Sequence, residues 1–504
     1  MRFLRTLALV AVPLAANAAP SAVSTFHSIG LYWSPEGGSE SNAARVEFRA
    51  SGSAEWRQGL DLWFDARNRE YRGSLVELEP GTEYEVRLAL SSGGVESMKT
   101  RTWSERFPVK RTVDVSGKKR VTIGPEDSGD EKGYVVFTAP PGRNVIEGND
   151  TDESCVVVRQ GAHHVIVRGL ELRNCKRYGV LIERQAQREG QPALDAQTHD
   201  IVIEGNEIAG WGGFGNLPSA KDLADTDGAI HCNYYRETED ARRPDRIVIQ
   251  GNRIRDPRHG SHPWVSAKHG RKHPKGPLGV MFNRCGSNHV IRYNDISSKN
   301  GNHYEDGLGG ADNFSAAGFP WADSDIYGNR IANVYDDGIE AEGGNRNVRI
   351  WGNHLERVNV AIANAATTTG PLYVWRNVSA NTQGMYDPEG RERRRQDGPF
   401  IKAGSRDATA NGGRAYYFHN TGMGAGAGIA RSGGRAYNFV ARNNQWPKSR
   451  VDPADGPFDL GKDRVERIAN FNDRYARPES GAHQSGAPPM RFGAEAYTAG
   501  RSAD

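Results

Sequence analysis

The chain has 504 residues, with 65 basic and 62 acidic side chains and a formal net charge of +3 at pH 7. So small an excess of charge does not indicate a nucleic-acid partner, and we expect none. Beyond the N-terminal segment no apolar run is long enough to cross a bilayer, so we expect no membrane insertion.

Residues 1–18 have the pattern of a secretory signal peptide. Arg2 and Arg5 precede an apolar run from Leu7 to Ala16, and Ala16-Asn17-Ala18 matches the small residues of a cleavage site. We therefore expect a secreted or periplasmic protein.

The chain has four cysteines, at positions 155, 175, 232 and 285. They are too few for a disulfide framework in a chain of this length, and their spacing is not that of a zinc site. We interpret them as buried core residues, with a bridge between Cys155 and Cys175 as the alternative in an oxidising compartment.

Residues 19–104 have the signals of a separate β-sandwich. Gly30–Trp33 and Ala44–Arg49 alternate apolar and polar side chains as strands do. The segment Leu78–Leu88 resembles the corner and following strand of a fibronectin type III domain, and this resemblance implies that Tyr84 is the corner tyrosine. We expect an accessory role for this domain, because nothing in it suggests catalysis.

Residues 105–480 repeat one unit, a short β-branched strand that ends in a tight turn, usually at asparagine. Asn329, Asn353 and Asn377 mark this turn 24 residues apart, and the last copies end at Asn420 and Asn443. Such a period without helical segments is typical of a solenoid. Asparagine suits the turn because it tolerates positive φ, and its side chain can hydrogen-bond to neighbours in stacked coils.

This repeat resembles the right-handed parallel β-helix of the pectate-lyase-like fold over roughly residues 110–480. The predicted fold class is all-β, a right-handed parallel β-helix solenoid preceded by a small β-sandwich, with residues 481–504 as a C-terminal tail. One set of strand residues is expected to stack inside the coil: Val165, Val202, Val248, Ile291, Ile326 and Val348.

A second column of residues directly precedes a glycine in successive repeats. These residues are apolar or aromatic in the outer repeats and aspartate in three central ones, Asp227, Asp306 and Asp337. Turn formation explains an aspartate before glycine at any one position, but it does not explain this change along the column. Since neighbouring coils lie about 4.8 Å apart, we expect Asp306 and Asp337 to be adjacent, with Asp227 two coils from Asp306.

The column and the longest inserted loops fall in the same repeats, which indicates a binding groove there. The catalytic candidates are Asp227, Asp306, Asp337, Asp336 and His303. The substrate-binding candidates are His231, Trp264, Lys268, Tyr304, Trp321 and Glu340, although each histidine or aromatic also has a structural interpretation. A Ca²⁺ ion, if one is bound, is expected at Asp306, Asp337 and Glu305.

Two acidic segments, Asp225-Thr226-Asp227-Gly228 and Asp336-Asp337, resemble motifs of the polygalacturonases, which are inverting β-helix hydrolases. The resemblance implies that Asp227 and Asp337 are catalytic carboxylates. The later Gly-His-Gly and Arg-Ile-Lys motifs of that family do not occur, since Lys268-His269-Gly270 comes too early and Ile401-Lys402 lacks the arginine.

We therefore expect a monomeric polysaccharide-cleaving enzyme, in the first place a glycoside hydrolase with paired aspartates. The basic loop from Arg253 to Lys275 favours an anionic glycan. One alternative is a Ca²⁺-dependent polysaccharide lyase or C5-epimerase acting on uronic-acid polymers, in which Lys268, Lys402 or an arginine removes a proton. Another is a non-catalytic glycan-binding surface protein.

Overall fold

The computed structural model describes most of the chain from residue 19 onward. The described residues are 19–149, 151–184, 196–213, 227–234, 243–299, 302–380, 398–405, 411–432, 434–435, 438–451, 458–459, 481–483 and 488–499. The predicted signal peptide and Asp225-Thr226 lie outside them. Within this part of the chain, no helix has the length and apolar character needed to span a membrane.

The N-terminal domain consists of two four-stranded antiparallel sheets, ordered β1-β2-β6-β5 and β4-β3-β7-β8. Their strands are β1 (Ser21–Ser24), β2 (Ile29–Trp33), β3 (Ala44–Ala50), β4 (Arg57–Gln58), β5 (Trp63–Asp65), β6 (Glu70–Leu75), β7 (Glu83–Leu90) and β8 (Val95–Arg101). Leu31 of one sheet and Val46 and Phe48 of the other belong to one buried core, so the domain is a β-sandwich. Buried Tyr84 accepts a hydrogen bond from the backbone N–H of Glu79 at 2.9 Å, as a corner tyrosine does.

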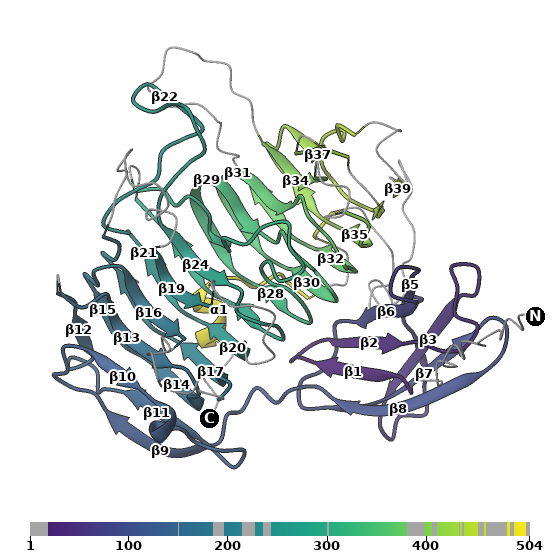
Figure 1. Cartoon of the computed structure of the whole chain (residues 1–504), viewed down its shortest axis with the longest axis horizontal. Helices are drawn as coiled ribbons and strands as arrows, with labels where there is room; N and C mark the ends of the chain where they lie inside the picture. The colour runs from purple at the N-terminus through teal and green to yellow at the C-terminus, as the bar shows by residue number, and fades with distance from the viewer. Residues whose placement is uncertain are drawn as a thin grey trace, which may run out of the picture.

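Most of the described residues from Val109 onward form a right-handed parallel β-helix with three ladders of strands (Figure 1). Ladder 1 contains β10 (Val121–Ile123), β13 (Ser154–Arg159), β16 (Tyr178–Glu183), β19 (Gly228–Asn233), β24 (Leu278–Asn283), β27 (Leu308–Gly309), β29 (Arg330–Glu340), β31 (His354–Asn364), β34 (Pro399–Ala403) and β37 (Ala427–Arg431). Ladder 2 contains β12 (Val145–Glu147), β15 (Glu171–Arg173), β18 (Glu207–Ala209), β21 (Arg253–Arg255), β26 (Asp295–Ser297), β33 (Val378–Ala380) and β36 (Thr421–Gly422), and it shares the 11-residue strands β29 and β31 with ladder 1.

Ladder 3 closes the coil. It contains β9 (Val109–Asp114), β11 (Tyr134–Thr138), β14 (His163–Arg168), β17 (His199–Glu204), β20 (Asp245–Gln250), β25 (Val290–Arg292), β28 (Asp325–Tyr327), β30 (Val348–Trp351), β32 (Leu372–Trp375), β35 (Ala415–Phe418), β38 (Phe439–Arg442) and β39 (Phe458–Asp459). Outside the ladders lie the hairpin β22 (Val265–Ser266) and β23 (Gly270–Arg271), the 3-10 helix η1 (Pro125–Asp127) and the helix α1 (Ala494–Ala499).

An internal ladder of asparagines follows the turns from Asn206 to Asn444. In each step, the backbone N–H and the side-chain amide of one asparagine donate to the side-chain oxygen of the next, as from Asn329 to Asn353 at 3.0 Å. Leu170 takes the asparagine position at the start of this ladder and donates its backbone N–H to Asn206. The final step runs from Asn420 to Asn444, so the predicted turn residue Asn443 is wrong by one position.

The coil interior is continuous and apolar, and it contains four of the six side chains expected there. Val202 and Val248 are the exceptions: they point to the outer face of ladder 3 and pack against Phe26 of the sandwich domain. Their neighbours Ile201 and Ile247 point inward instead. Strand alternation explains the error, because a shift of one residue moves a side chain to the opposite face.

The outer face of ladder 3 is the docking surface of the sandwich domain. Phe26 and the linker residues Trp103 and Phe107 cover this face, and ring contacts join Phe26 to both of them. Buried hydrogen bonds accompany these contacts: the hydroxyl of Tyr32 donates to the Asp323 carboxylate at 2.6 and 2.7 Å. The predicted sandwich is therefore packed as part of one body with the coil.

Two disulfides link neighbouring segments of the coil. One joins Cys155 to Cys175 and the other joins Cys232 to Cys285. The first was the alternative considered from the sequence, and the second was not anticipated, because it joins cysteines 53 residues apart on successive coils. The C-terminal segment also contacts the coil, since the hydroxyl of Tyr497 donates to Glu204 at 2.6 Å.

Candidate active site

The centre of ladder 1 brings two of the predicted aspartates together. Leu308 of β27 pairs with Ile339 of β29, which aligns Asp306 with Asp337 on the next coil. The backbone N–H of Asp337 donates to the Asp306 carboxylate at 2.9 Å, so the expected adjacency is present.

Asp227 does not share this register. Gly228, the residue after it, is the one paired with Leu278, so Asp227 lies one position outside the column. Its carboxylate accepts hydrogen bonds from Arg177 at 2.7 Å and from the backbone N–H of Gly213 at 3.0 Å. The buried ion pair gives Asp227 a structural role that the sequence did not indicate.

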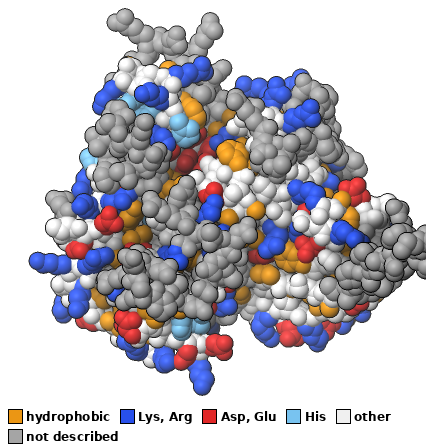
Figure 2. Space-filling view, in the orientation of Figure 1, with side chains coloured by type: hydrophobic (Ala, Val, Ile, Leu, Met, Phe, Trp, Pro, Cys, Tyr) orange, Lys and Arg blue, Asp and Glu red, His pale blue; other side chains and the backbone are white. Residues whose placement is uncertain are grey.

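Asp306 and Asp337 belong to a cluster of six buried carboxylates, here called the acidic cluster: Glu305, Asp306, Asp336, Asp337, Glu340 and Glu342. Asp306, Asp336 and Asp337 each offer an oxygen within 4.8 Å of the other two, and Asp337, Glu340 and Glu342 do the same. Figure 2 shows acidic side chains in a hollow near the middle of this face, beside histidine side chains.

Lys402 of β34 forms ion pairs with two carboxylates of this cluster. Its Nζ lies 2.5 Å from Oδ2 of Asp337 and 3.1 Å from Oε1 of Glu342. On successive coils of ladder 1, Glu340 pairs with Ala363, and Ala363 pairs with Lys402. Because alanine is small, the lysine can reach across one coil to the carboxylates. The side chain of Lys402 keeps 20% of its surface exposed, so solvent reaches it.

The inserted loop between β21 and β24 covers the other side of the acidic cluster. Its His273 lies 3.4 Å from Glu305 and 3.2 Å from Asp336, and the indole N–H of Trp264 donates to Asp336 at 3.1 Å. The rings of Trp264 and His273 meet edge to face. Trp264 was predicted from the sequence, whereas His273 was noted only as part of a basic loop.

Burial and mutual repulsion keep the acidic cluster partly protonated. Burial raises the pKa of Asp306 well above its ordinary value, and the charges of Glu340 and Asp336 raise it further. Burial also raises the pKa values of Asp337 and Glu340, although Lys402 opposes this effect at both.

For the two cations of the site, burial and the neighbouring carboxylates have opposite effects on the pKa. Burial alone lowers the pKa of Lys402, but the carboxylates of Asp337 and Glu342 outweigh burial and raise the pKa well above the usual lysine value. Burial likewise disfavours charged His273, yet Glu305 and Asp336 raise its pKa to about 10. Both side chains are therefore positively charged at neutral pH.

The acidic cluster fits a hard divalent cation. Its donors are all carboxylate oxygens, the ligands that Ca²⁺ prefers, and the spacing of Asp306, Asp336 and Asp337 suits one shared ion. Among the described residues, Oδ1 of Asp337 is buried without a hydrogen-bond partner, as expected of an oxygen reserved for a cation. Glu305, predicted as a ligand, instead accepts the backbone N–H of Gly276 and lies against His273.

Several other predicted site residues have structural roles. Tyr304 is fully buried in the coil core and donates its hydroxyl to backbone oxygens of Ile254 and Ser297, so it cannot stack on a sugar. His231 is fully buried on ladder 1 against the ring of Tyr178. These placements correct both substrate-binding predictions, because a side chain without exposed surface cannot contact a polysaccharide.

The remaining candidates lie at the edges of the acidic cluster or outside it. His303 is buried and stacks on Tyr335, and burial together with Arg357 lowers its pKa to about 4, so it is neutral and does not contact the carboxylates in the described structure. Trp321 packs under the guanidinium of Arg243. Lys268 is exposed in the turn of the β22–β23 hairpin. Glu340, a substrate-binding candidate, belongs to the cluster and accepts a hydrogen bond from Asn313.

The raised pKa values predict how stability depends on pH without divalent cations. A carboxyl with a raised pKa binds a proton in the folded chain that the unfolded chain has already released, so the free energy of unfolding falls as pH rises above about 4. His273 acts in the same direction, since its stabilisation is complete below about 6.5 and is lost as pH rises through about 10. We expect the Tm in chelator to fall between pH 5 and 8, and Ca²⁺ to restore it.

Calorimetry of the wild type and the Asp306→Asn variant tests this expectation. The amide cannot ionise, so the variant should show a smaller fall in Tm with pH than the wild type. An equal fall in both proteins would contradict the origin in the acidic cluster.

Comparison with known proteins gives distant matches only. No protein-family model and no curated protein sequence matches the chain. Pectate lyase PelI from Erwinia chrysanthemi matches at 10% identity over 88% of this chain and 98% of that chain, with a TM-score of 0.17. The same enzyme in complex with tetragalacturonic acid matches at 8% identity over 88% and 98%, with a TM-score of 0.18. Pectate lyase Pel3 from Pectobacterium carotovorum matches at 10% identity over 87% and 98%, with a TM-score of 0.18. The parallel pairing of strands in the three ladders defines the fold.

Proposed function

We propose that the protein is a secreted polysaccharide lyase that cleaves a uronic-acid polymer by β-elimination. The observation that carries this proposal is the position of Lys402, whose partly exposed ammonium lies beside the carboxylates of Asp337 and Glu342. A lyase needs one group that removes a proton and one positive centre that binds the substrate carboxylate. This site supplies a lysine and a set of oxygen ligands for a cation within one groove.

The reaction divides between these two parts. A divalent cation held by Asp306, Asp336 and Asp337 would neutralise the substrate carboxylate and so lower the pKa of the adjacent C5 proton. Lys402, in its uncharged form, takes that proton; the C5–H electrons form the C4–C5 double bond, and the C4–O bond breaks. The departing oxygen takes up a proton from water, and the new chain end is an unsaturated sugar.

The protonation of Lys402 depends on the carboxylates beside it. Asp337 and Glu342 raise its pKa, and a cation that shares their negative charge removes part of this effect. Cation binding and activation of the base are therefore coupled. The exposed Lys268, Arg271 and Lys272 on the β22–β23 hairpin add positive charge near the groove, which suits an acidic polymer.

The geometry gives less support to a glycoside hydrolase. Hydrolysis requires two carboxyl groups placed on either side of the scissile bond, about 5–5.5 Å apart for retention and about 6.5–9.5 Å apart for inversion. Here Asp306 and Asp337 offer carboxylate oxygens within 4.8 Å of each other in one cluster, and Asp227 forms an ion pair with Arg177. A C5-epimerase needs the same proton abstraction and differs in returning the proton to C5.

Product analysis separates these reactions. The full-length protein is incubated with neutral and uronic-acid polysaccharides, in Ca²⁺ and in chelator, and the products are followed by ultraviolet absorbance and by reducing ends. A lyase gives both signals on uronic-acid polymers, only with the cation. Reducing ends without absorbance would indicate a hydrolase. Incorporation of solvent deuterium at C5 without cleavage would indicate an epimerase. Binding without any product would indicate a glycan-binding protein.

A further inference from the structure

A second cluster of ionisable side chains lies on ladder 3, away from the acidic cluster on ladder 1. The strands β14, β17 and β20 begin with the residue pairs His163-His164, His199-Asp200 and Asp245-Arg246. The parallel register places His163, His199 and Asp245 in one column. No function assigned above uses these residues.

The second member of each pair adopts the same unusual backbone conformation. His164, Asp200 and Arg246 have φ values of 50°, 53° and 55°, which is the left-handed region that non-glycine residues rarely occupy. The repeated turn brings these three side chains next to the first column, so that imidazoles and a carboxylate from two adjacent coils converge.

The contacts among these side chains define a ligand set. Nδ1 of His199 lies 2.7 Å from Oδ2 of Asp200, and Nε2 of His164 lies 3.8 Å from the same oxygen. His164, His199 and Asp200 each offer one ligand atom within 4.8 Å of the other two. Two imidazole nitrogens and one carboxylate oxygen form the donor set of many zinc-type sites.

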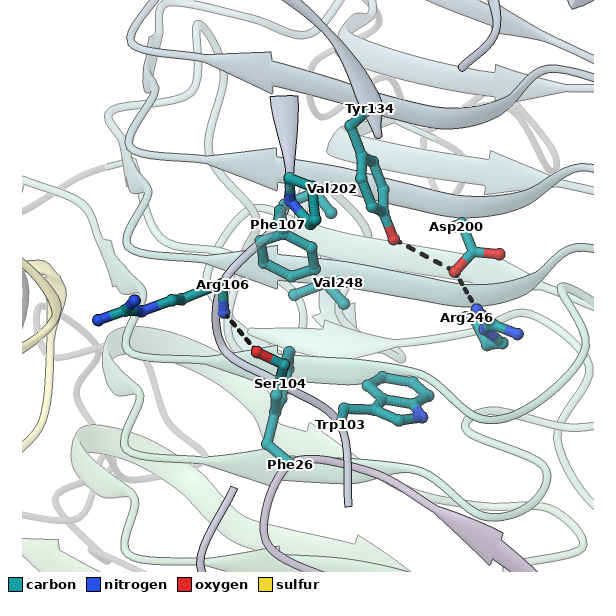
Figure 3. Close-up of a pocket in the computed structure, with 11 residues that line it drawn as sticks. Phe26, Trp103, Ser104, Arg106, Phe107, Tyr134, Asp200, Val202, Arg246 and Val248 are labelled. Atoms are coloured by element: carbon teal, nitrogen blue, oxygen red, sulfur yellow. Dashed lines mark hydrogen bonds and ion pairs between the residues drawn. The ribbon is translucent and has the colours of Figure 1, made fainter. Parts of the chain in front are cut away.

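Neighbouring groups hold these ligands in place. The other carboxylate oxygen of Asp200 accepts a hydrogen bond from the hydroxyl of Tyr134 at 3.3 Å and forms an ion pair with Arg246, so Oδ2 is the oxygen that faces the two imidazoles (Figure 3). His163 contacts Nδ1 of His164 at 3.1 Å and stacks on the ring of His199 at 4.9 Å. Such outer contacts fix ring orientation in metal sites.

The site is also accessible. Tyr134, Asp200 and Arg246 line a pocket of about 220 Å³ between ladder 3 and the linker that carries Trp103 and Phe107, so the pocket adjoins the site at Asp200, whereas the two histidines lie outside its lining (Figure 3). His199 is only partly buried, so a hydrated cation can approach it and keep a water ligand on the open side.

We infer that His164, His199 and Asp200 bind a transition-metal dication of the zinc type, with His163 as a positioning residue. Nitrogen donors distinguish this site from the all-oxygen acidic cluster, which suits Ca²⁺. The inference does not depend on the proposed lyase activity, because the two sites share no residue and prefer different ions.

Titration with Co²⁺ in excess Ca²⁺ tests the inference on the full-length protein. Ca²⁺ occupies oxygen sites, and Co²⁺ bound through nitrogen and oxygen gives a visible absorption spectrum. We expect one equivalent of Co²⁺ to bind and Zn²⁺ to displace it. The His163→Gln variant should bind about 10–100-fold more weakly, and His164→Gln and His199→Gln should lose more affinity than that.

The matched control is His354→Gln. His354 lies on ladder 2, and its imidazole stacks on Phe492. The Co²⁺ affinity of this variant should equal that of the wild type. Circular dichroism without metal establishes that each variant is folded. Absence of Co²⁺ binding in excess Ca²⁺, or binding that survives both His164→Gln and His199→Gln in folded protein, would overturn the assignment and leave Asp200 as the ion-pair partner of Arg246.

Discussion

Replacing Lys402 with methionine is expected to lower kcat by about 10²–10⁴-fold on the uronic-acid polymer that the wild type cleaves. Methionine has similar length but cannot accept a proton, so the C5–H bond loses its base. The buried partners Asp337 and Glu342 also lose their counter-charge, so the assay is run in saturating Ca²⁺. Initial rates of ultraviolet absorbance measure the effect, and KM should change much less than kcat.

Two further variants separate a base from a simple ion-pair partner. Lys402→Arg retains the positive charge but cannot release its proton near neutral pH, so its kcat should fall as far as that of Lys402→Met although the site keeps its charge balance. Lys110→Met is the matched control, since Lys110 is paired with Asp130 at 2.6 Å on the exposed surface. Near-normal turnover in Lys402→Arg would contradict the role of Lys402 as the base.

Deleting residues 20–104 is expected to prevent stable folding of the coil. The deletion removes fully buried Phe26 and partly buried Trp103, which cover the apolar outer face of ladder 3, and complete burial of a large apolar side chain stabilises by about 1.5–3 kcal/mol. It also removes the hydroxyl of Tyr32, which donates a hydrogen bond to buried Asp323. Burial raises the pKa of that carboxyl to about 6. These losses together are comparable with the whole stability of a typical protein, about 5–15 kcal/mol.

The truncated chain is examined by its soluble yield, by circular dichroism and by binding of a hydrophobic dye. A soluble fragment with the Tm of the full-length protein would contradict the expectation. In the intact chain, Tyr32→Phe leaves the Asp323 carboxylate without this partner and should cost about 1–3 kcal/mol. Calorimetry should then show one transition at lower temperature, since sandwich and coil unfold together; two separate transitions would show that the domains are independent.

The repeat in the sequence was sufficient to predict the β-helix and the adjacency of Asp306 with Asp337. Local rules produce these features: β-branched strands, asparagine turns and a fixed coil spacing recur in every copy. Stacking of the coils also brings Asp336, a catalytic candidate, and Glu340, a substrate-binding candidate, into the acidic cluster around Asp337.

Predictions of side-chain position were wrong where the strand register differed by one residue from the expected register. Asp227 precedes a glycine as Asp306 does, yet the strand pairing places Gly228 in the column and Asp227 beside Arg177. Val202 and Val248 alternate with their neighbours, and only the coil register decides which of the two faces each side chain occupies.

The sequence by itself determined the solenoid, its Asn-turn period and the concentration of carboxylates in its central repeats, since each of these depends on residues close together in the chain. The tertiary structure alone decided that Lys402, 65 residues after Asp337, reaches that carboxylate across the small Ala363. It also decided that His273 faces Asp336 and that the sandwich covers ladder 3. These contacts join distant segments, and their charges and distances exist only once the coils have stacked.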